Sequence, residues 1–334
     1  MQKLYKETQC LDVSKSYSLN SKLFDIQIPF VKSKKFKSTN EEKLPIDVEV
    51  VKKAYDNLKK LFTMQCDNIS FKIKNNYDAR VMANNFYDTL MQQSFNKFLG
   101  GNTSDKSLIF NFENELYLIP PKSLFYCHDI KDISNHLSNK KYNLILMDPP
   151  WWNKFIRRKR KKNFKFGYDM MYDKDLSNIP INNLLEENGI LGVWCTSAPS
   201  HIEAILTELF PAWNVEFIAQ WFWLKITKFG EPICDFSNTL GKQPFERVLF
   251  GKKLNFDRKI PQPEKNKVFM SIPSAIHSHK PPLCDLLKPY LPENPECLEL
   301  FARYLLPSWT SYGNEVLKLQ HISLFTDKNL LDDG

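Results

Sequence analysis

Apolar side chains recur at helical spacing in two stretches of the first third of the chain. The first stretch covers about residues 47–66, with its apolar positions at Val51, Tyr55, Leu58 and Phe62. The second covers about residues 79–99 and includes Val81, Met82, Phe86, Leu90 and Phe95. Spacing of three or four predicts two amphipathic helices. Because residues 1–45 are polar, rich in lysine and weakly periodic, we expect residues 1–115 to form a mainly helical N-terminal module with a flexible start.

The pattern changes after Pro120 and Pro121, where short apolar or β-branched runs begin to alternate with helical stretches. The predicted strands cover residues 124–126, 142–147, 190–196, 215–226, 246–250, 297–301 and 316–319. The predicted helices cover residues 198–210 and 283–290. Alternation of this kind is typical of an α/β fold, in which helices cover both faces of a sheet. We therefore expect an α/β domain over residues 116–325 and a tail at 326–334.

Length and composition are those of an ordinary globular protein, with 334 residues, 43% hydrophobic and 25% charged. The longest apolar runs, 142–147 and 215–226, are too short or too interrupted to span a membrane, and no apolar stretch follows a basic start. The seven cysteines are scattered without a CxxC pair, so neither a disulfide framework nor a structural zinc site is expected. These features predict an intracellular protein without a metal site.

The net charge of +8 arises in one short segment. Residues 152–165 hold eight basic side chains and no acid, whereas the rest of the chain balances at 38 basic and 38 acidic residues. Clustered charge attracts polyanions, so the segment predicts contact with nucleic-acid phosphates. The side chains expected to make this contact are Lys154, Arg157, Arg158 and Arg160. A nuclear localisation signal is an equally good interpretation of residues 157–162.

The strongest candidate for chemistry is an acid that directly follows a predicted buried strand. The apolar run 142–147 leads into Asp148, Pro149, Pro150 and Trp151. In α/β sheets ligands bind beyond the carboxyl ends of the strands, which is where this acid would lie. The prolines fix the backbone and remove two N–H donors, and the indole offers a flat face for stacking. With ten glycines and no GxG, the chain has neither a dinucleotide fingerprint nor a P-loop.

These groups suit the exocyclic amine of a nucleobase, which is a weak nucleophile because its lone pair is delocalised into the ring. Its two N–H bonds can donate to Asp148 and to the carbonyl of Pro149, which localises the lone pair and aims it at a methyl sulfonium. Trp151 can stack on the purine. Such a reaction needs positioning more than strong base catalysis. The alternative is a plain Asp-Pro-Pro turn at the end of a strand.

Four ordered landmarks resemble one protein family. In chain order they are residues 148–151 (DPPW), 278–281 (SHKP), 299–303 (ELFAR) and 307–315 (PSWTSYGNE). The chain resembles the eukaryotic adenine-N6 methyltransferases that include the catalytic subunit of the messenger-RNA methylation complex. The likeness covers about residues 116–322. It is strongest to the methyltransferase-like 4 subfamily, in residues 221–227, 277–283 and 298–320.

The resemblance implies a permuted Rossmann-like methyltransferase fold with S-adenosyl-L-methionine as cofactor. The permutation places the cofactor-binding segments after the reactive motif, which accounts for the missing glycine-rich loop. Asp148, Pro149, Pro150 and Trp151 would be the catalytic residues that orient the target adenine. The residues implied to bind the cofactor are Asp129, Ile130, Asp148, Lys280, Arg303, Asn314 and Glu315. In the family, the counterparts of Asp129 and Ile130 contact the cofactor adenine, and the counterpart of Lys280 contacts the methionine carboxylate. The counterparts of Arg303, Asn314 and Glu315 contact the ribose.

Each implied cofactor residue also has a structural interpretation. Asp129 could cap a helix, and Lys280 could be solvated. Arg303 could form an ion pair, and Asn314 could stand in a turn. Glu315 replaces a Gln of some relatives, and a carboxylate can still accept two hydroxyl hydrogen bonds. The segment after Arg303 is shorter than in the messenger-RNA enzyme, so one ribose-binding Asn of that relative has no counterpart.

The resemblance implies methyl transfer to the N6 amine of adenine in nucleic acid. The methyltransferase-like 4 subfamily points to 2′-O-methyladenosine in U2 small nuclear RNA, with adenine in DNA as a second substrate. In the family the basic segment is a loop that closes over the substrate, and Tyr168 aligns with a substrate-proximal tyrosine; a core tyrosine is the alternative. The alternative function is a catalytically silent nucleic-acid-binding subunit, which the intact Asp148 disfavours. We expect a monomer in the nucleus, with the cytoplasm as a second location.

Overall fold

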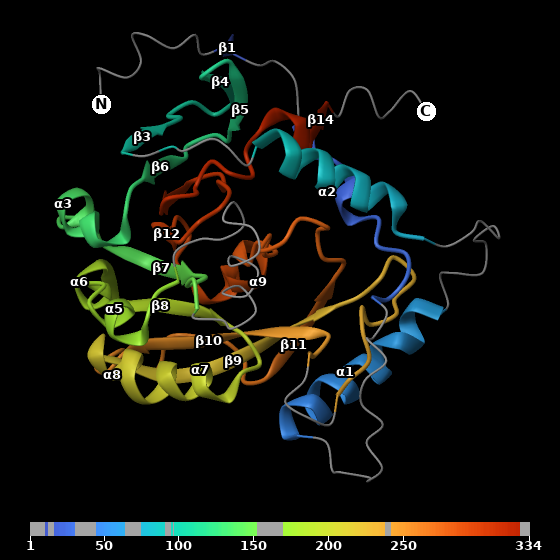
Figure 1. Ribbon diagram of the computed structural model, residues 1–334. Helices are drawn as coiled ribbons and strands as arrows, with labels where there is room; N and C mark the ends of the chain where they lie inside the picture. Colours follow the sequence, from blue (N-terminus) through green and yellow to red (C-terminus); the bar gives the residue numbers. More distant parts are fainter. Residues whose placement is uncertain are drawn as a thin grey trace.

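One large sheet organises the computed structural model, which describes residues 11–12, 17–30, 45–63, 75–90, 95, 97–151, 170–237 and 242–327. Within this part of the chain the sheet has nine strands in the order β11-β9-β10-β8-β7-β12-β13-β6-β3 (Figure 1). In chain order the strands are β3 Phe98–Gly101, β6 Leu124–Cys127, β7 Tyr142–Met147, β8 Leu185–Cys195, β9 Val215–Lys225, β10 Phe245–Lys253, β11 Lys267–Ser271, β12 Cys297–Leu300 and β13 Trp309–Tyr312.

Five neighbouring strands of this sheet, β8, β7, β12, β13 and β6, are parallel. Strand β7 is the middle strand of the nine-stranded sheet, and its residues 144–147 are almost completely buried. Such a continuous apolar run is typical of a parallel strand that is covered on both faces. The register pairs Met147 with Leu300 and Leu300 with Tyr312, so the carboxyl ends of β7, β12 and β13 lie level.

The sheet is covered on both faces, as the alternation of strands and helices predicted. On one face, alternate strand residues such as Ile145 and Leu191 pack against short helices that include Leu176 and Leu209. On the other face, Leu144 and Leu146 pack with Trp194, Trp221 and the segment around α9. The helical elements after β6 are η3 Ile130–Asp132, α3 Ile133–Leu137, α5 Asp173–Ser177, α6 Ile181–Leu184, α7 Pro199–Ala204, the π-helical turn η4 Ile205–Leu209, α8 Phe210–Ala212, α9 Cys284–Leu287, η5 Lys288–Tyr290 and η6 Ile322–Leu324.

Both predicted N-terminal helices are present, as α1 Ile46–Thr63 and α2 Tyr77–Leu90. The predicted extension of the second helix to about residue 99 is wrong, because residues 98–99 belong to strand β3. The apolar face of α1 packs Val48, Val51 and Tyr55 against β9 and β10. Helix α2 packs Ala83 and Phe86 into a separate cluster with residues near the chain's C-terminal end. Both helices therefore bury their apolar faces on elements beyond residue 220. A domain boundary near residue 115 stays a prediction.

The first third of the chain also contributes strands, which the helical periodicity did not predict. Strand β3 pairs antiparallel with β6 at the end of the central sheet. Strands β4 Leu108–Phe112 and β5 Glu115–Ile119 form a hairpin. Its two turn residues, Glu113 and Asn114, have φ of 51° and 67°, as a two-residue hairpin turn requires. The remaining strands are β1 Leu11–Asp12, which pairs with β4, and β2 Tyr17–Leu19, which pairs with β14 Phe325–Asp327.

One strand prediction is wrong. Residues 316–319 form turns, whereas the strand in this region is β13, before them. Val316 and Leu317 are fully buried in a cluster with Phe110, Tyr117 and neighbouring residues. A short apolar run shows that a segment is buried but does not fix its backbone conformation. In the described part of the chain, no helix is long and apolar enough to cross a membrane.

The attachment of α1 to the sheet can be tested at Asp47. Its Oδ2 accepts a hydrogen bond of 2.7 Å from Arg247 on β10, whose side chain is buried. In an Asp47→Ala variant this guanidinium loses its anionic partner, so we expect the free energy of unfolding to fall by about 1–3 kcal/mol. Urea unfolding would measure it. Glu49→Ala, at an exposed acid in the same helical turn, is the control; equal losses in both variants would contradict the prediction.

Candidate active site

Five of the predicted cofactor-binding residues follow the ends of four adjacent strands. Asp148 follows β7, Arg303 follows β12, Asn314 and Glu315 follow β13, and Asp129 follows β6. Because β7, β12, β13 and β6 are parallel neighbours, their carboxyl ends form one edge of the sheet. In open α/β sheets this edge is where ligands bind.

The Asp148 carboxylate lies between two cations. Its Oδ2 accepts a hydrogen bond of 3.1 Å from Arg303, and its Oδ1 lies 3.5 Å from the Nζ of Lys280. The Asp148 side chain is only 16% exposed, so these contacts are poorly screened by water. The two cations therefore hold the carboxylate in place and keep its charge compensated.

A second acid, Glu246, lies at the start of β10 and joins Lys280 to Lys225. Its two carboxylate oxygens each form a short ion pair with one of these ammonium groups. Burial would raise the pKa of Glu246, but the two ammonium groups lower it well below its usual range. No sequence pattern indicated a role for Glu246 or Lys225, because both fall inside predicted strands.

Lys280 reaches the strand ends from the loop that carries the SHKP sequence. Burial would lower its pKa, but Asp148 and Glu246 outweigh this effect and raise it. Its Nζ lies 5.3 Å from the ring centre of Trp194, and its backbone carbonyl accepts a hydrogen bond of 3.1 Å from Tyr304. Lys280 is thus a largely buried, ion-paired cation, and the solvated interpretation is wrong.

On the opposite side of Asp148, Arg303 extends the chain of ion pairs to Glu315. The Nε of Arg303 donates to Glu315 at 3.2 Å, and Lys318 lies 2.6 Å from the other oxygen of that carboxylate. Burial would raise the pKa of Glu315, but Lys318 and Arg303 lower it. Arg303 therefore forms the structural ion pairs that were its alternative interpretation, and its position beside Asp148 is compatible with ligand binding as well.

Glycine is required between β13 and Asn314. Gly313 has φ of +150°, and a Cβ at this position would lie 3.1 Å from the Cα of Phe301. Phe301 itself has a left-handed φ of 58°, and so does Ser278 with 68°. Strained backbone of this kind is concentrated at functional sites. The turn leaves Asn314 exposed and Glu315 half-buried.

Asp129 and Ile130 begin the short helix η3. The Asp129 side chain caps it by accepting a hydrogen bond of 3.0 Å from the N–H of Lys131. Its backbone carbonyl accepts a hydrogen bond of 3.2 Å from the Tyr312 hydroxyl, and Ile130 is buried. The capping interpretation is thus confirmed, while contact of these two residues with a cofactor stays a prediction.

The residues after Asp148 pack into the wall of the site. The Pro149 carbonyl accepts from the N–H of Trp151 at 2.8 Å, and the Pro150 carbonyl accepts from Met171 at 3.1 Å. The Trp151 indole is 5% exposed and donates from Nε1 to the Trp194 carbonyl at 3.0 Å.

His201 stacks on the Trp151 indole with a centroid distance of 5.1 Å. The structure therefore shows Trp151 as a packed side chain, and purine stacking on it stays a prediction. The predicted substrate contacts of the loop after Trp151 lie outside the described residues; these are Lys154, Arg157, Arg158, Arg160 and Tyr168.

The sequence matches the MT-A70 family over residues 142–315, more than half of its length. It is 37% identical to the N(6)-adenine-specific methyltransferase METTL4 of Homo sapiens over 233 residues, 67% of this chain and 48% of the relative. It is 40% identical to the DNA N6-methyl methyltransferase of Caenorhabditis elegans over 221 residues, 66% and 58% of the two chains. It is 32% identical to the N6-methyladenosine RNA methyltransferase MTA1 of Pyricularia oryzae over 217 residues, which are 62% of this chain and 56% of the relative.

The chain spans about half the length of these curated relatives. With the match over the β7–β13 region and these identities, the chain belongs to the MT-A70 family. Methyltransferases of this family depend on S-adenosyl-L-methionine. The match includes all the landmarks of the strand-end site from Asp148 to Glu315.

The charged groups at the strand ends fit this cofactor. Its methionine end carries one carboxylate and one ammonium group, and its ribose carries two hydroxyls. Lys280 and Arg303 can pair with the carboxylate, and Asp148 can accept from the ammonium group. Glu315 can accept from the hydroxyls. When bound, the cofactor supplies an electrophilic methyl group on a sulfonium.

Glu299, on β12, is a buried acid that the sequence analysis did not single out. Its Oε2 forms no hydrogen bond with any residue that the structure describes. Burial, with a contribution from Asp148 and against the opposing effect of Arg303, raises the pKa of Glu299 to about 8. Glu299 therefore holds its proton in the folded protein at neutral pH, and its neutral form adds no negative charge beside Asp148.

The protonation of Glu299 predicts a pH-dependent stability. The unfolded chain loses this proton near pH 4.5 and the folded protein near pH 8, so the folded state loses stability as the pH rises through this window. A Glu299→Gln variant lacks this loss. As the pH rises through this window, we expect the free energy of unfolding of the variant to increase relative to that of wild type. The total increase should be roughly 1.4 kcal/mol for each unit by which folding raises the pKa of Glu299.

Urea unfolding of wild type and Glu299→Gln at several pH values across this window would measure the difference. Glu296→Gln, at an exposed acid just before β12, is the matched control and should follow the wild type at every pH. If the difference in unfolding free energy between Glu299→Gln and wild type stays constant across the window, the prediction that Glu299 is protonated in the folded protein is contradicted.

The role of Glu315 can be separated from its ion pairs by two variants. Glu315→Gln keeps an acceptor for the ribose hydroxyls, whereas Glu315→Ala removes it. We expect the alanine variant to bind S-adenosyl-L-methionine about tenfold more weakly, and the glutamine variant to bind close to wild type. Isothermal titration calorimetry would measure both. Equal weakening in the two variants would show that the carboxylate acts through Arg303 and Lys318.

Proposed function

We propose that this chain is an S-adenosyl-L-methionine-dependent methyltransferase that methylates the N6 amine of adenine in nucleic acid. The observation that carries the proposal is the Asp148 carboxylate, which lies at the carboxyl end of β7 between Lys280 and Arg303. The names of the relatives support the same reaction, because each specifies N6 methylation or an N(6)-adenine-specific methyltransferase.

The residues on the strand ends suit this reaction by positioning. Asp148 can accept one N–H bond of the adenine amine. The Pro149 carbonyl already accepts from Trp151, but a carbonyl oxygen has two lone pairs and can accept a second N–H. Lys280 and Arg303 fix the carboxylate before the substrate arrives, so little reorganisation is needed. The methylated amine then releases one proton to solvent.

The polymer that we propose is RNA, with 2′-O-methyladenosine in U2 small nuclear RNA as the target and adenine in DNA as a second substrate. This choice rests on the likeness to the methyltransferase-like 4 subfamily. The relatives' names include both polymers, since one specifies DNA and another specifies RNA. The experiment below therefore compares them directly.

Several further features belong to the same proposal. The fold would be a permuted Rossmann-like fold, which is supported by the position of β12 and β13 between β6 and β7 although both follow β7 in the chain. The first 115 residues would form the N-terminal module of the enzyme, and residues 116–325 its methyltransferase domain. The enzyme would act in the nucleus as a monomer.

The reaction can be tested with purified protein, cofactor and adenine-containing oligonucleotides. The set includes RNA with and without a 2′-O-methyl group on the target and single-stranded DNA, and nucleoside mass spectrometry identifies the product. We expect N6-methyladenine from the wild type and a loss of at least about 100-fold in Asp148→Asn. The oligonucleotide with the highest kcat/KM identifies the preferred polymer.

Asp56→Asn is the control, because it makes the same change at an exposed acid of α1. It should keep wild-type activity, and thermal unfolding should show that all the proteins are folded. Absence of product on every oligonucleotide, together with absence of cofactor binding, would overturn the proposal and favour a catalytically silent nucleic-acid-binding subunit.

A further inference from the structure

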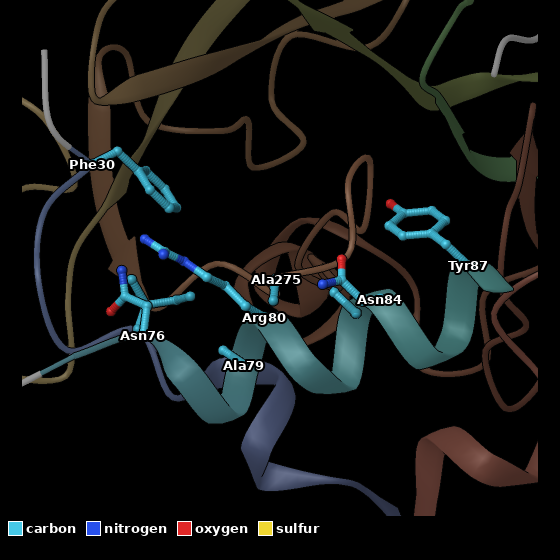
Figure 2. A pocket seen from close by; sticks show the side chains of 9 residues that line it. Phe30, Asn76, Ala79, Arg80, Asn84, Tyr87 and Ala275 are labelled. Atoms are coloured by element: carbon cyan, nitrogen blue, oxygen red, sulfur yellow. The ribbon is translucent and has the colours of Figure 1, made fainter. Parts of the chain in front are cut away.

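A cavity of about 200 Å³ lies between α2 and the segment of residues 26–30 (Figure 2). One side of α2, together with the residue before it, provides most of the lining at helical spacing. The lining residues are Ile26, Phe30, Asn76, Ala79, Arg80, Ala83, Asn84, Tyr87 and Ala275. Ala79 and Ala83 stand one turn apart on α2, and their small side chains leave the space that forms the cavity.

Hydrogen bonds fix the walls of this cavity. The Asn76 side chain is buried and accepts from the N–H groups of Gln27 at 2.8 Å and Ile28 at 3.0 Å. It also donates to the Ile28 carbonyl at 3.0 Å. The N–H of Phe30 donates to the Ile233 carbonyl at 2.7 Å. Because the walls are held by the protein itself, a ligand would not have to order them on binding.

The polar side chains at the cavity mouth are free to bind. Phe30 is 40% exposed, and Arg80 and Asn84 are exposed. In the part of the chain that the structure describes, Arg80 forms no ion pair and the Asn84 carboxamide forms no hydrogen bond. Figure 2 shows the Arg80 side chain extending toward Phe30. A second cation, the Nζ of Lys242, lies 5.3 Å from the centre of the Phe30 ring.

These groups select a small, flat and anionic ligand. Cavities that hold drug-sized ligands measure about 300–1,000 Å³, so this one suits a single ring system rather than a whole cofactor. Phe30 offers a stacking face, Asn84 offers a donor and an acceptor, and Arg80 offers a planar cation. Among the residues that the structure describes, no carboxylate lines the cavity. Proteins that bind single-stranded nucleic acid combine aromatic platforms and cations in this way.

A short chain of contacts connects the cavity to the active site. The hydroxyl of Tyr87 accepts a hydrogen bond of 3.0 Å from the N–H of His277. The carbonyl of the next residue, Ser278, accepts from Arg303 at 3.5 Å, and Arg303 contacts Asp148. The loop of residues 275–280 therefore forms a wall of the cavity at one end and carries Lys280 into the active site at the other.

We propose that this cavity binds one unpaired base of the strand that carries the target adenine, with Phe30 stacking on the base. Arg80 and Asn84 contact the edge of the base or its phosphate. The proposal rests on the proposed function, because the strand must reach the cavity while its adenine lies beside Asp148. It assigns substrate contacts to α2 and residues 26–30, which lie outside the segment matched to the MT-A70 family.

The test compares Phe30→Ala and Arg80→Ala with wild type on RNA of about 4 nucleotides and of about 16 nucleotides, which bracket common single-strand site sizes. We expect both variants to lose about tenfold in affinity and in kcat/KM for the long RNA, while both retain wild-type values for the short one. Tyr77→Ala and Arg258→Ala are the controls, because they remove an exposed aromatic and an exposed arginine that do not line the cavity.

An abasic scan of the long RNA identifies the bound position. Removal of the base at one position should weaken wild-type binding about tenfold and should not weaken Phe30→Ala binding further. Equal affinity of the cavity variants and wild type for all RNAs would overturn the subsite. Fluorescence anisotropy measures binding without turnover, so the subsite is tested even if no RNA is methylated. Absence of methylation would instead overturn the proposed function.

Discussion

The candidate active site depends on the pairing of partly buried charges of alternating sign around Asp148. One continuous series of ion pairs and close contacts runs through the site, in the order Lys225, Glu246, Lys280, Asp148, Arg303, Glu315 and Lys318. Removing charges from water costs desolvation free energy, and each charge here is compensated by its neighbours. The same pairing makes the site selective, because a ligand can enter the series only with charged or polar groups that replace the contacts it displaces.

The topology of the sheet brings this series together from distant parts of the sequence. The members come from the ends of β9, β10, β7, β12 and β13 and from one loop, and they lie at a common edge because of how those strands are ordered. Strong backbone constraints support the edge, including Gly313 against Phe301 and the left-handed conformations of Ser278 and Phe301. The scaffold thus fixes the positions of side chains that local sequence could not place.

Much of the central fold could be predicted from hydrophobic periodicity, and the motif at residues 148–151 indicated the correct edge. Strand β7, the strands around it and both N-terminal helices follow from spacing alone. The hairpin β4–β5 and the turns at residues 316–319 could not be predicted from spacing, because a short apolar run indicates burial and not backbone conformation. Glu246 and Glu299 could not be identified, because each lies within a strand and acquires its shifted pKa only from burial and tertiary neighbours.

Strand β3 gives the N-terminal third a role in the solubility of the catalytic sheet. It is the last strand of the sheet in the described part of the chain, and it covers the backbone donors and acceptors along one side of β6. Exposed strand edges of this kind recruit strands from other molecules. Shortened forms of the protein that begin after residue 101 would present β6 as a bare edge. The edge that would then pair with other molecules belongs to the strand that precedes Asp129.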